Sequence, residues 1–262
     1  MKKKFALSFF VIATAFSSLT AFGLVLESNK MAVVEEYANS ETWVIFDVDN
    51  TLIESSLQIG SAQWRDHIRK KARLEGYDPA ERELVLDKFW NFVQHFVPVN
   101  LVDKATLATL QKLKQEKFIA FALTAREPIE LAHTQRQLGS VGIHFSSDAF
   151  HHNILLSLPF PGIYDHGVVY CGENTKGDTL SALLKETGLT PKRIVFVDDR
   201  ENQITEVKQA VEQMGIEFIG VRFSGADARV AAFDPAIADL QWSSLPKVLS
   251  DEEAKERLAE AP

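Results

Sequence analysis

The stretch Trp43-Val44-Ile45-Phe46-Asp47-Val48-Asp49-Asn50-Thr51-Leu52 decides the fold class of this chain. Its first four residues are apolar and either aromatic or β-branched, which predicts a buried strand. The strand ends in two carboxylates, Asp47 and Asp49, that are spaced one residue apart. Carboxylates at the carboxyl end of a buried strand are costly to desolvate unless a cation or hydrogen-bond donors meet them. The stretch therefore predicts a site at this strand end, and Mg²⁺ is the cation that we expect there.

The spacing of the two carboxylates suits phosphoryl transfer. Asp47 can attack an electrophilic phosphorus as a nucleophile, and Asp49 can protonate the leaving oxygen and later activate a water. These roles need one carboxylate ionised and the other protonated in turn, and close packing of two acids separates their pKa values. The pair alone also fits a calcium-type acidic loop or a simple Asp cap at a strand end, so other residues have to decide.

Beyond this stretch, apolar strands alternate with helices. We expect further strands at residues 118–123, 193–197 and 216–221, helices at residues 103–117, 127–139, 177–187 and 201–214, and short strands and turns over residues 143–172. This alternation predicts an α/β fold with a doubly wound, Rossmann-like parallel sheet and helices on both faces. Right-handed crossovers place the carboxyl ends of such strands on one edge, where their polar residues should meet. These residues are Asp47, Asp49, Thr124, Asp198 and Asp199.

The residues after the first strand predict a small helical cap insert at residues 54–97. A first helix is expected over residues 57–74, and Asp78-Pro79-Ala80-Glu81 is a good start for a second helix that ends before Pro98. Two helices inserted directly after a strand that ends in a site can cover that site as a lid. Packing of the helices on each other and on the core explains most of their aromatic residues more simply.

The remaining segments complete the domain plan. The α/β core is expected to comprise residues 24–53 and 98–225, in a chain whose 46% hydrophobic content is ordinary for one globular domain. Residues 226–262 form a polar tail that we expect to pack on the core or to trail from it. Ser250-Asp251-Glu252-Glu253 is a capping box for a short last helix in this tail.

The amino terminus has the layout of a secretory signal peptide at residues 1–23. Lys2-Lys3-Lys4 precede an apolar run over residues 5–16, and small and polar residues follow, so we expect cleavage near Gly23. This layout predicts a periplasmic or secreted protein. The alternative is an uncleaved anchor over residues 5–26, and only this anchor would link the chain to a membrane.

Charge, cysteine and histidine content narrow the function classes. The net charge of -8 argues against an extended nucleic-acid-binding surface, and it allows a local basic pocket for a phosphate. Cys171 is the only cysteine, so no intrachain disulfide can form, and we interpret it as a packing residue rather than a catalytic thiol. Four histidines are interpreted as surface or core residues rather than metal ligands: His133, His144, His151 and His152.

The residues at the strand ends resemble the four motifs of the haloacid dehalogenase (HAD) superfamily, and in particular an exported bacterial phosphatase of that superfamily. The resemblance spans about residues 43–221 and rests on Asp47-Val48-Asp49-Asn50-Thr51, Thr124 at a strand end, Lys176 before a helix, and Asp198-Asp199 at a later strand end. It implies that Asp47 is the nucleophile, forms an aspartyl-phosphate and ligates Mg²⁺. Asp49 would be the general acid and base, with its backbone carbonyl on the metal.

The resemblance implies roles for the other motif residues as well. Thr124 would donate a hydrogen bond to a phosphoryl oxygen, and Lys176 would hold the nucleophile and neutralise phosphoryl charge. Asp199 would ligate the metal directly or through water with Asp198 as its partner. Because the family assigns these two differently from branch to branch, both are candidates. Such parts are what phosphoryl transfer needs, since the protein contributes mainly positioning and charge.

Asp49 also separates branches within the superfamily. The branch that cleaves carbon–halogen bonds lacks this acid, and transport ATPases have Lys-Thr-Gly-Thr after the nucleophile, so the chain resembles the phosphatases and mutases. Two arginines, Arg126 and Arg200, follow strand ends at the same edge. Each of them either makes a structural contact, such as an ion pair, or reaches a second charge on the substrate.

The expected function is a Mg²⁺-dependent phosphomonoester hydrolase that acts through an aspartyl-phosphate on a phosphorylated small molecule or macromolecule. Two alternatives stay open. One is a phosphotransferase or mutase of the same fold, which passes the phosphoryl group to another alcohol. The other is a non-catalytic exported protein that binds a phosphorylated ligand, although a binding protein has no need of Asp49. The sequence does not predict the oligomeric state.

Overall fold

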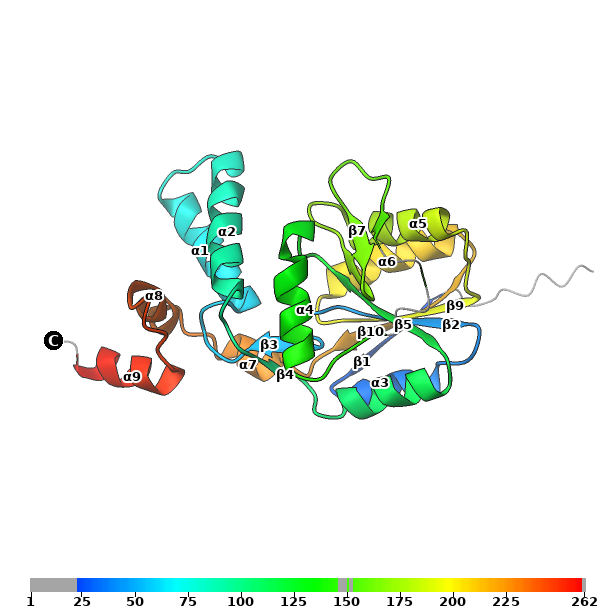
Figure 1. Cartoon of the computed structure of the whole chain (residues 1–262), viewed down its shortest axis with the longest axis horizontal. Helices are drawn as coiled ribbons and strands as arrows, with labels where there is room; N and C mark the ends of the chain where they lie inside the picture. Colours follow the sequence, from blue (N-terminus) through cyan, green and yellow to red (C-terminus); the bar gives the residue numbers. More distant parts are fainter. Residues whose placement is uncertain (1–22, 146–149, 151–152, 261–262) are drawn as a thin grey trace, which may run out of the picture.

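The computed structural model describes residues 23–145, 150 and 153–260 of the chain (Figure 1). The predicted signal peptide, apart from Gly23, lies outside the described residues, and so do His151 and His152. Within the described ranges, no helix has the length and apolar character that crossing a bilayer requires. The last residues of the alternative anchor belong to strand β1 (Leu24–Ser28).

A central sheet organises the described part of the chain. Strand β2 (Thr42–Phe46) contains the predicted buried strand, and all 5 of its residues are buried. It pairs in parallel with β5 (Ile119–Thr124) on one side and with β9 (Arg193–Asp198) on the other, and β10 (Glu217–Phe223) pairs in parallel with β9. Because these strands are buried on both faces, they appear in the sequence as nearly continuous apolar runs.

Shorter strands complete both edges of the sheet. On one edge β1 pairs in parallel with β10, and we did not predict this strand because its apolar residues continue from the leader. On the other edge β8 (Val168–Tyr170) pairs in parallel with β5, and the antiparallel strands β7 (Ile163–Asp165) and β6 (Ile154–Leu155) follow. The strand order is β1-β10-β9-β2-β5-β8-β7-β6. The chain thus moves outward from β2 in both directions, which confirms the predicted doubly wound α/β fold.

Helices cover both faces of the sheet, as predicted (Figure 1). Helices α5 (Lys176–Thr187) and α6 (Glu201–Gln213) lie on one face, and α3 (Thr106–Gln115), α4 (Leu131–Ser140) and the 3-10 helix Met31–Glu36 lie on the other. Neighbouring residues of β2 point to opposite faces, so Ile45 packs in the layer of α5 and α6 and Val44 packs in the other layer. Each fully buried aliphatic side chain contributes about 1.5–3 kcal/mol, and β2 therefore anchors both layers.

The stretch between β2 and β5 forms a helical pair on a two-stranded stem. The stem consists of the antiparallel strands β3 (Ile53–Ser55) and β4 (Val99–Leu101), and the helices are α1 (Ala62–Leu74) and α2 (Pro79–Gln94). Helix α1 begins later than predicted because Gly60 has a φ of +75° and Ser61 caps the helix by accepting a hydrogen bond from the N–H of Trp64. Asp78 caps α2 by accepting a hydrogen bond from the N–H of Glu81.

Most of the tail packs on this helical pair, and its first helix also contacts the core, because Asp227 forms a 2.6 Å ion pair with Arg222 of β10. It contains α7 (Asp227–Ala231), α8 (Pro235–Ser243) and α9 (Asp251–Glu260). The ring centroid of Trp242 lies 4.7 Å from that of Phe89 and 6.0 Å from that of Trp64. Buried Gln241 accepts a hydrogen bond from the N–H of Ile59 at 2.9 Å. The aromatic faces of α1 and α2 need cover that the sheet does not supply, and the tail supplies it.

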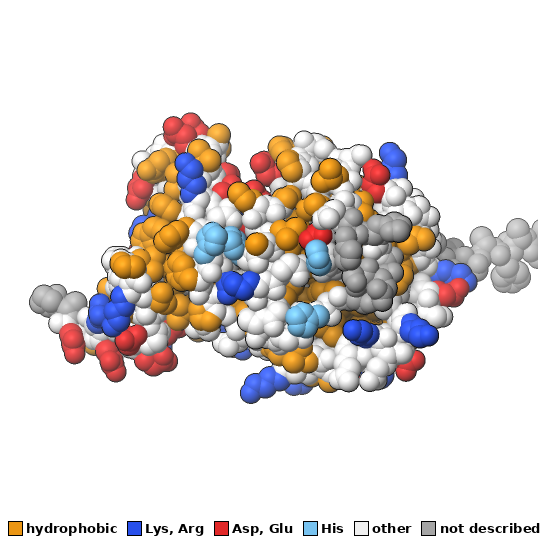
Figure 2. All heavy atoms as spheres, viewed as in Figure 1, with side chains coloured by type: hydrophobic (Ala, Val, Ile, Leu, Met, Phe, Trp, Pro, Cys, Tyr) orange, Lys and Arg blue, Asp and Glu red, His pale blue; other side chains and the backbone are white. Residues whose placement is uncertain are grey.

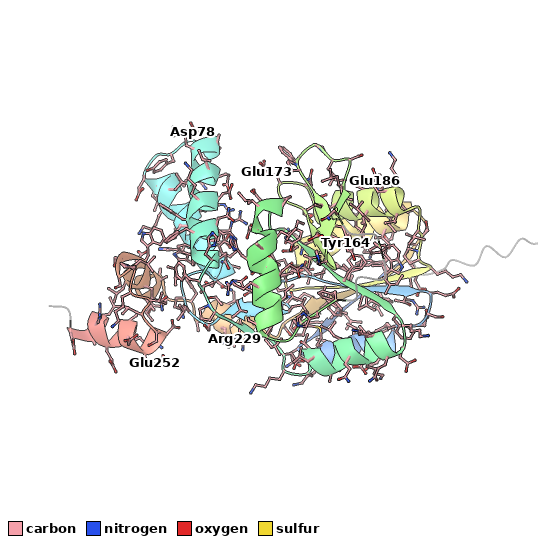
Figure 3. All side chains as sticks on the ribbon, viewed as in Figure 1. Asp78, Tyr164, Glu173, Glu186, Arg229 and Glu252 are labelled. Carbon is pink, nitrogen blue, oxygen red and sulfur yellow. The ribbon has the colours of Figure 1, made fainter. Side chains whose placement is uncertain are left out.

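Helices α1, α2, α8 and α9 together form one side of the molecule. Figure 3 shows their side chains filling the space between them, with Asp78 at the tip of the α1–α2 pair and Glu252 on α9. In Figure 2, hydrophobic side chains gather over this part of the surface. Two of the exposed aromatic residues here belong to α2, where Phe89 is 38% and Phe92 is 52% exposed. The aromatic residues of α2 therefore do not all pack inward.

A second set of contacts joins α2 to the core. The indole N–H of Trp90 donates a 2.6 Å hydrogen bond to the buried carboxylate of Glu130. Glu130 closes the 3-10 helix Pro128–Glu130, and its other oxygen accepts a hydrogen bond from the N–H of Glu127. Burial, together with the carboxylates of Asp87 and Glu130, raises the pKa of Glu127 to about 7. Acidic groups are therefore packed closely where α2 meets the core.

Gly60 should be more sensitive to substitution than Gly76, although their φ values are both positive, +75° and +87°. A Cβ at Gly60 would lie 2.9 Å from Val93 and 3.0 Å from Val97, whereas nothing lies within 4 Å of a Cβ at Gly76. We expect Gly60→Ala to lower the free energy of unfolding by about 1–3 kcal/mol more than Gly76→Ala, because overpacking adds to a shared backbone strain. Urea denaturation measures the difference, and equal losses would contradict the close packing at Gly60.

Glu127→Gln should stabilise the protein at alkaline pH. The folded-state pKa of about 7 lies above the ordinary 4.5, so the folded protein binds more protons than the unfolded chain between these values, and stability falls as the pH rises through about 7. A neutral glutamine removes this loss. We expect the variant to exceed the wild type by about 1 kcal/mol at pH 8 and by much less at pH 5. Urea denaturation at both pH values tests this, and a pH-independent difference would count against it.

Candidate active site

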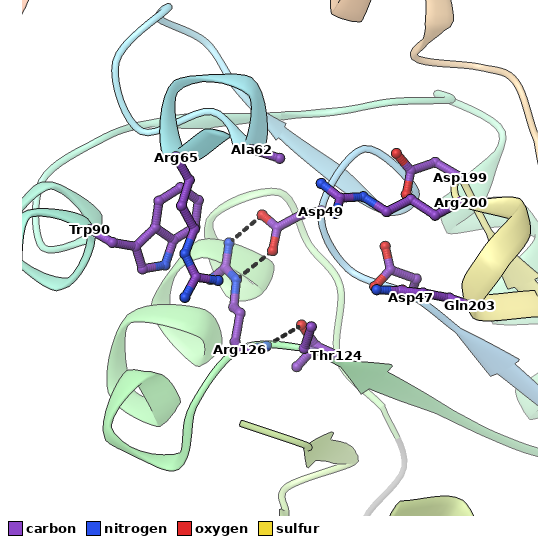
Figure 4. Close-up of a pocket in the computed structure, with 11 residues that line it drawn as sticks. Asp47, Asp49, Ala62, Arg65, Trp90, Thr124, Arg126, Asp199, Arg200 and Gln203 are labelled. Atoms are coloured by element: carbon purple, nitrogen blue, oxygen red, sulfur yellow. Dashed lines mark hydrogen bonds and ion pairs between the residues drawn. The ribbon is translucent and has the colours of Figure 1, made fainter. Parts of the chain in front are cut away.

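The predicted site residues meet at one edge of the sheet, as right-handed crossovers require. They are Asp47 and Asp49 after β2, Thr124 at the end of β5, Asp198 and Asp199 at the end of β9, and Lys176 at the start of α5. Four of them, Asp47, Asp49, Thr124 and Asp199, line a cavity of about 70 Å³ (Figure 4). Lys176 and Asp198 are buried and bonded to each other, and Lys176 is bonded to Asp47 as well.

Lys176 is the buried centre of charge at this edge. Its Nζ donates to Oδ1 of Asp47 at 2.5 Å and to Oδ2 of Asp198 at 2.6 Å. Burial lowers the pKa of Lys176, but the two carboxylates more than offset this effect and raise it above the ordinary range. Burial also raises the pKa of Asp47 to about 7, against the opposing charge of Lys176. One lysine therefore does not neutralise the carboxylates around it.

Three carboxylates form a group that could hold a metal ion. Oxygen atoms of Asp47, Asp198 and Asp199 lie within 4.8 Å of one another. Both oxygens of Asp198 already accept hydrogen bonds, one from Lys176 and one, at 2.8 Å, from the N–H of Arg200. Burial and the charge of Asp47 raise the pKa of Asp199 to about 6. Hard oxygen ligands with too little counter-charge are a donor set that could hold a divalent cation.

Asp49 forms a two-point ion pair with Arg126 (Figure 4). Nε of Arg126 lies 2.8 Å from Oδ2 of Asp49, and Nη2 lies 2.7 Å from Oδ1. The buried guanidinium also donates to Thr134 and Gln137. Burial alone would raise the pKa of Asp49, but the charge and hydrogen bonds of Arg126 lower it below its ordinary value. Of the two roles left open for Arg126, the structure supports the ion pair.

Hydrogen bonds from the loops position two further residues. Oγ1 of Thr124 accepts a 3.2 Å hydrogen bond from the N–H of Arg126, which leaves its hydroxyl proton for a group in the cavity. Asn50 has a φ of +61° and donates to Asp199 at 3.3 Å. Its side-chain oxygen accepts a hydrogen bond from Gln63 of α1, also at 3.3 Å. An Asn directly after the second aspartate is a sequence signal for this left-handed turn.

The helical insert contributes residues to the cavity that we did not predict: Ala62, Arg65 and Trp90. The guanidinium carbon of Arg65 lies 5.5 Å from the ring centroid of Trp90 (Figure 4). Nη2 of Arg65 also lies 3.2 Å from Oδ1 of Asp87. Arg200 lines the cavity from the core and lies 3.6 Å from Asp66 of α1. A helix that packs its aromatic residues inward has the same sequence pattern as a helix that lines a site. The sequence therefore does not identify the residues of the insert that line the cavity.

The cysteine and the described histidines have no place in the cavity lining. Cys171 is buried, and burial raises the pKa of its thiol to about 12, which agrees with a packing role. The ring centroids of His133 and His95 lie 3.8 Å apart, where α4 meets the end of α2. His144 is exposed and follows α4 in the chain.

Two relatives from Chlamydia are similar over most of the chain. A protein of Chlamydia pneumoniae named "Putative outer membrane protein" is 20% identical over 254 residues, which are 97% of this chain and 96% of that protein. A protein of the same name from Chlamydia trachomatis serovar D is 22% identical over 218 residues, which are 83% of this chain and 82% of that protein.

The solved structures that are similar to this fold include HAD family proteins. One is a HAD family enzyme of Bacteroides thetaiotaomicron in a magnesium complex, with 13% identity and a TM-score of 0.41 over 69% of this chain and 92% of that chain. Another is a HAD family hydrolase of Deinococcus radiodurans with bound phosphate and sodium, with 14% identity and a TM-score of 0.39 over 74% of this chain and 96% of that chain.

One family model matches residues 27–255. The match runs from β1 into α9, so it includes the sheet, the inserted helices and the tail. Because it covers far more than half of the sequence, the chain belongs to the family described as "Protein of unknown function (DUF2608)".

Proposed function

We propose that this chain is an exported, Mg²⁺-dependent phosphomonoester hydrolase that acts through an aspartyl-phosphate on Asp47. The observation that carries the proposal is the buried Lys176, which bridges Asp47 and Asp198 behind a cavity that Asp49 also lines. A carboxylate nucleophile, a lysine and hard oxygen ligands are the parts that phosphoryl transfer uses, because this chemistry depends on positioning and charge.

In the first step Asp47 attacks the phosphorus of the monoester. Its Oδ1 is held by Lys176, so the carboxylate keeps one orientation. The bond from the Asp47 oxygen to phosphorus forms as the bond from phosphorus to the leaving oxygen breaks, and protonated Asp49 gives its proton to that oxygen. Lys176 and the hydroxyl of Thr124 stabilise the charge on the phosphoryl oxygens.

In the second step Asp49 acts as a base. It takes a proton from a water that attacks the phosphorus, the bond from phosphorus to Asp47 breaks, and inorganic phosphate leaves. The ion pair with Arg126 favours the ionised form of Asp49, which is the form that this step needs. The first step needs the protonated form, so the ion pair is weakened while Asp49 carries the proton, and it re-forms as that proton passes to the departing alcohol.

Mg²⁺ fits the oxygen ligands at this edge. Asp47, Asp199 and the backbone carbonyl of Asp49 would hold it, and the bound ion would supply positive charge to the phosphoryl oxygens. We assign the direct contact to Asp199 rather than Asp198, because both oxygens of Asp198 already accept hydrogen bonds.

The insert is proposed to act as a cap, and the leader to direct export. Arg65 and Trp90 support the cap, since they line the cavity from the side of the insert. Export to the periplasm or beyond rests on residues 1–23, and the names of the chlamydial relatives, which refer to the outer membrane, support it. The substrate is a phosphorylated small molecule or macromolecule, and the arginines Arg65 and Arg200 suit its negative charge.

Two assays separate this proposal from its alternatives. A rate that rises with the concentration of an added alcohol, with transfer of the phosphoryl group to it, would indicate a phosphotransferase. Binding of Mg²⁺ without turnover of any ester would indicate a phospho-ligand-binding protein.

Removal of the nucleophile should abolish turnover. In Asp47→Asn the amide cannot form the aspartyl-phosphate, so phosphate release from an aryl phosphate should fall by at least about 1,000-fold. Chelation of Mg²⁺ should have a comparable effect that added Mg²⁺ reverses. Asp178→Asn is the matched control, because Asp178 is an exposed carboxylate in the first turn of α5. Substantial residual activity in Asp47→Asn would refute the mechanism.

Asp49→Asn should slow the first step more for alkyl than for aryl phosphates. An alkoxide needs a proton from the general acid, whereas a nitrophenolate leaves without one. Rapid-quench measurement of alcohol release in the first turnover isolates this step from hydrolysis of the aspartyl-phosphate. We expect a loss of about 100-fold or more for the alkyl ester and a much smaller loss for the aryl ester. Equal losses for both esters would rule out proton donation by Asp49.

A further inference from the structure

A chain of buried side-chain hydrogen bonds leads from the site to the inserted helices. Nη1 of Arg126 donates to Oε1 of Gln137 at 2.7 Å, and Nε2 of Gln137 donates to Oε1 of Gln94 at 2.7 Å. Nε2 of Gln94 then donates to the carbonyl oxygen of Gly60 at 2.9 Å. The exposed fractions are 3% for Arg126, 0% for Gln137 and 1% for Gln94. The chain starts at the same guanidinium that holds Asp49.

The two ends of this chain fix the direction of every hydrogen bond in it. An arginine side chain can only donate and a backbone carbonyl can only accept, so neither glutamine amide can flip without losing its hydrogen bonds. Nη1 of Arg126 is therefore held by Gln137 together with Thr134, and Nε and Nη2 remain for Asp49. Because the guanidinium is planar and rigid, the position of Nη1 sets the plane in which Asp49 is bound.

The far end of the chain lies where both inserted helices join the stem. Gly60 precedes α1, and Gln94 is the last residue of α2. Gly60 is packed so closely that a Cβ there would lie 2.9 Å from Val93 and 3.0 Å from Val97. Arg136 of α4 donates to the backbone carbonyl of Gln94 at 2.8 Å. A shift of α1 and α2 relative to the sheet would therefore displace the amide of Gln94.

Stability alone is a weak reason for this arrangement. Each buried polar group has to be desolvated, and apolar side chains of similar volume often replace buried polar networks without loss of stability. A fully satisfied network does, however, define one geometry for the groups that it contains. Among the groups that this hydrogen-bond network orients, the one that matters to the proposed reaction is the carboxylate of Asp49.

We propose that Gln94 and Gln137 are positioning residues that couple the inserted helices to Asp49 through Arg126. The inference rests on the proposed role of Asp49 as acid and base. With the helices seated on the core, the chain is complete and Arg126 holds Asp49 in one plane. With the helices displaced, the network opens at Gln94, so the Gln137 amide, which holds Nη1 of Arg126 together with Thr134, loses the partner that orients it. The insert thus controls the orientation of Asp49 without a contact between these glutamines and the substrate.

Gln94→Met and Gln137→Met test this coupling, because methionine keeps the volume of glutamine and removes its hydrogen bonds. With an alkyl phosphate and saturating Mg²⁺, each variant should lose about tenfold in kcat while KM stays within about twofold. The double variant should lose no more than either single variant, because both substitutions cut the same chain. If Gln94→Met does not fold, Gln137→Met decides the test, because it removes the hydrogen bonds of Gln137 to Arg126 and Gln94.

Gln241→Met is the matched control. Gln241 is also a buried glutamine, with 1% of its surface exposed, and it also holds the insert, through the N–H of Ile59. Its other described hydrogen bonds go to Leu249 and Asp251, away from Arg126. The kcat of Gln241→Met should stay within about twofold of the wild-type value. Equal falls in kcat for Gln94→Met and Gln241→Met would overturn the proposal, and so would a raised KM with an unchanged kcat.

A second readout does not depend on turnover. The Nε–H proton of Arg126, assigned by NMR from its loss in Arg126→Lys, should exchange with water at least about tenfold faster in Gln94→Met than in the wild type or Gln241→Met. Unchanged exchange in Gln94→Met overturns the coupling even in an active enzyme. The exchange rate of this proton can rise in Gln94→Met even if the wild type hydrolyses no ester. In that case the coupling of Gln94 to Arg126 is supported and the proposed hydrolase function is refuted.

Discussion

One buried cation, Lys176, is the constraint on which the site depends. A charge away from water needs partners, and the partners of Lys176 are carboxylates at the ends of two neighbouring parallel strands, β2 and β9. These strands and the start of α5 must therefore come together at one edge. The carboxylates there outnumber the lysine, and burial, with smaller contributions from the charges of Asp198 and Asp49, raises the pKa of Asp47. The same surplus makes the edge suitable for a divalent cation.

The environments of the two aspartates after β2 differ in one simple way. Asp47 shares its cation with Asp198, whereas Asp49 has the two-point contact of Arg126 to itself. As a result, the pKa of Asp47 lies above the ordinary value and that of Asp49 lies below it. Burial raises the pKa of Asp47 despite Lys176, whereas Arg126 outweighs the effect of burial at Asp49, and differences of this kind give neighbouring acids different roles.

The strand ends could be predicted from the sequence, and the contacts between distant segments could not. Apolar runs located β2, β5 and β9, and the crossover rule then placed Asp47, Thr124 and Asp198 at one edge. No period or spacing encodes which loop residue meets Asp49, so the pairing with Arg126 came from the structure. The contacts between the tail and the insert could not be predicted for a similar reason, because Trp242 finds its aromatic partners on the insert and not on the sheet.

The packing of the tail on the insert also sets an order of events during synthesis. Trp64 and Trp90 of the insert belong to an apolar cluster against which Trp242 of the tail packs. Almost the whole α/β core lies between the insert and the tail in the sequence. A ribosome releases the insert early and the tail late, and all strands of the described sheet precede the tail. The sheet can therefore close while the aromatic face of the insert is still bare. During biosynthesis this face therefore stays available to chaperones until the helices of the tail have emerged.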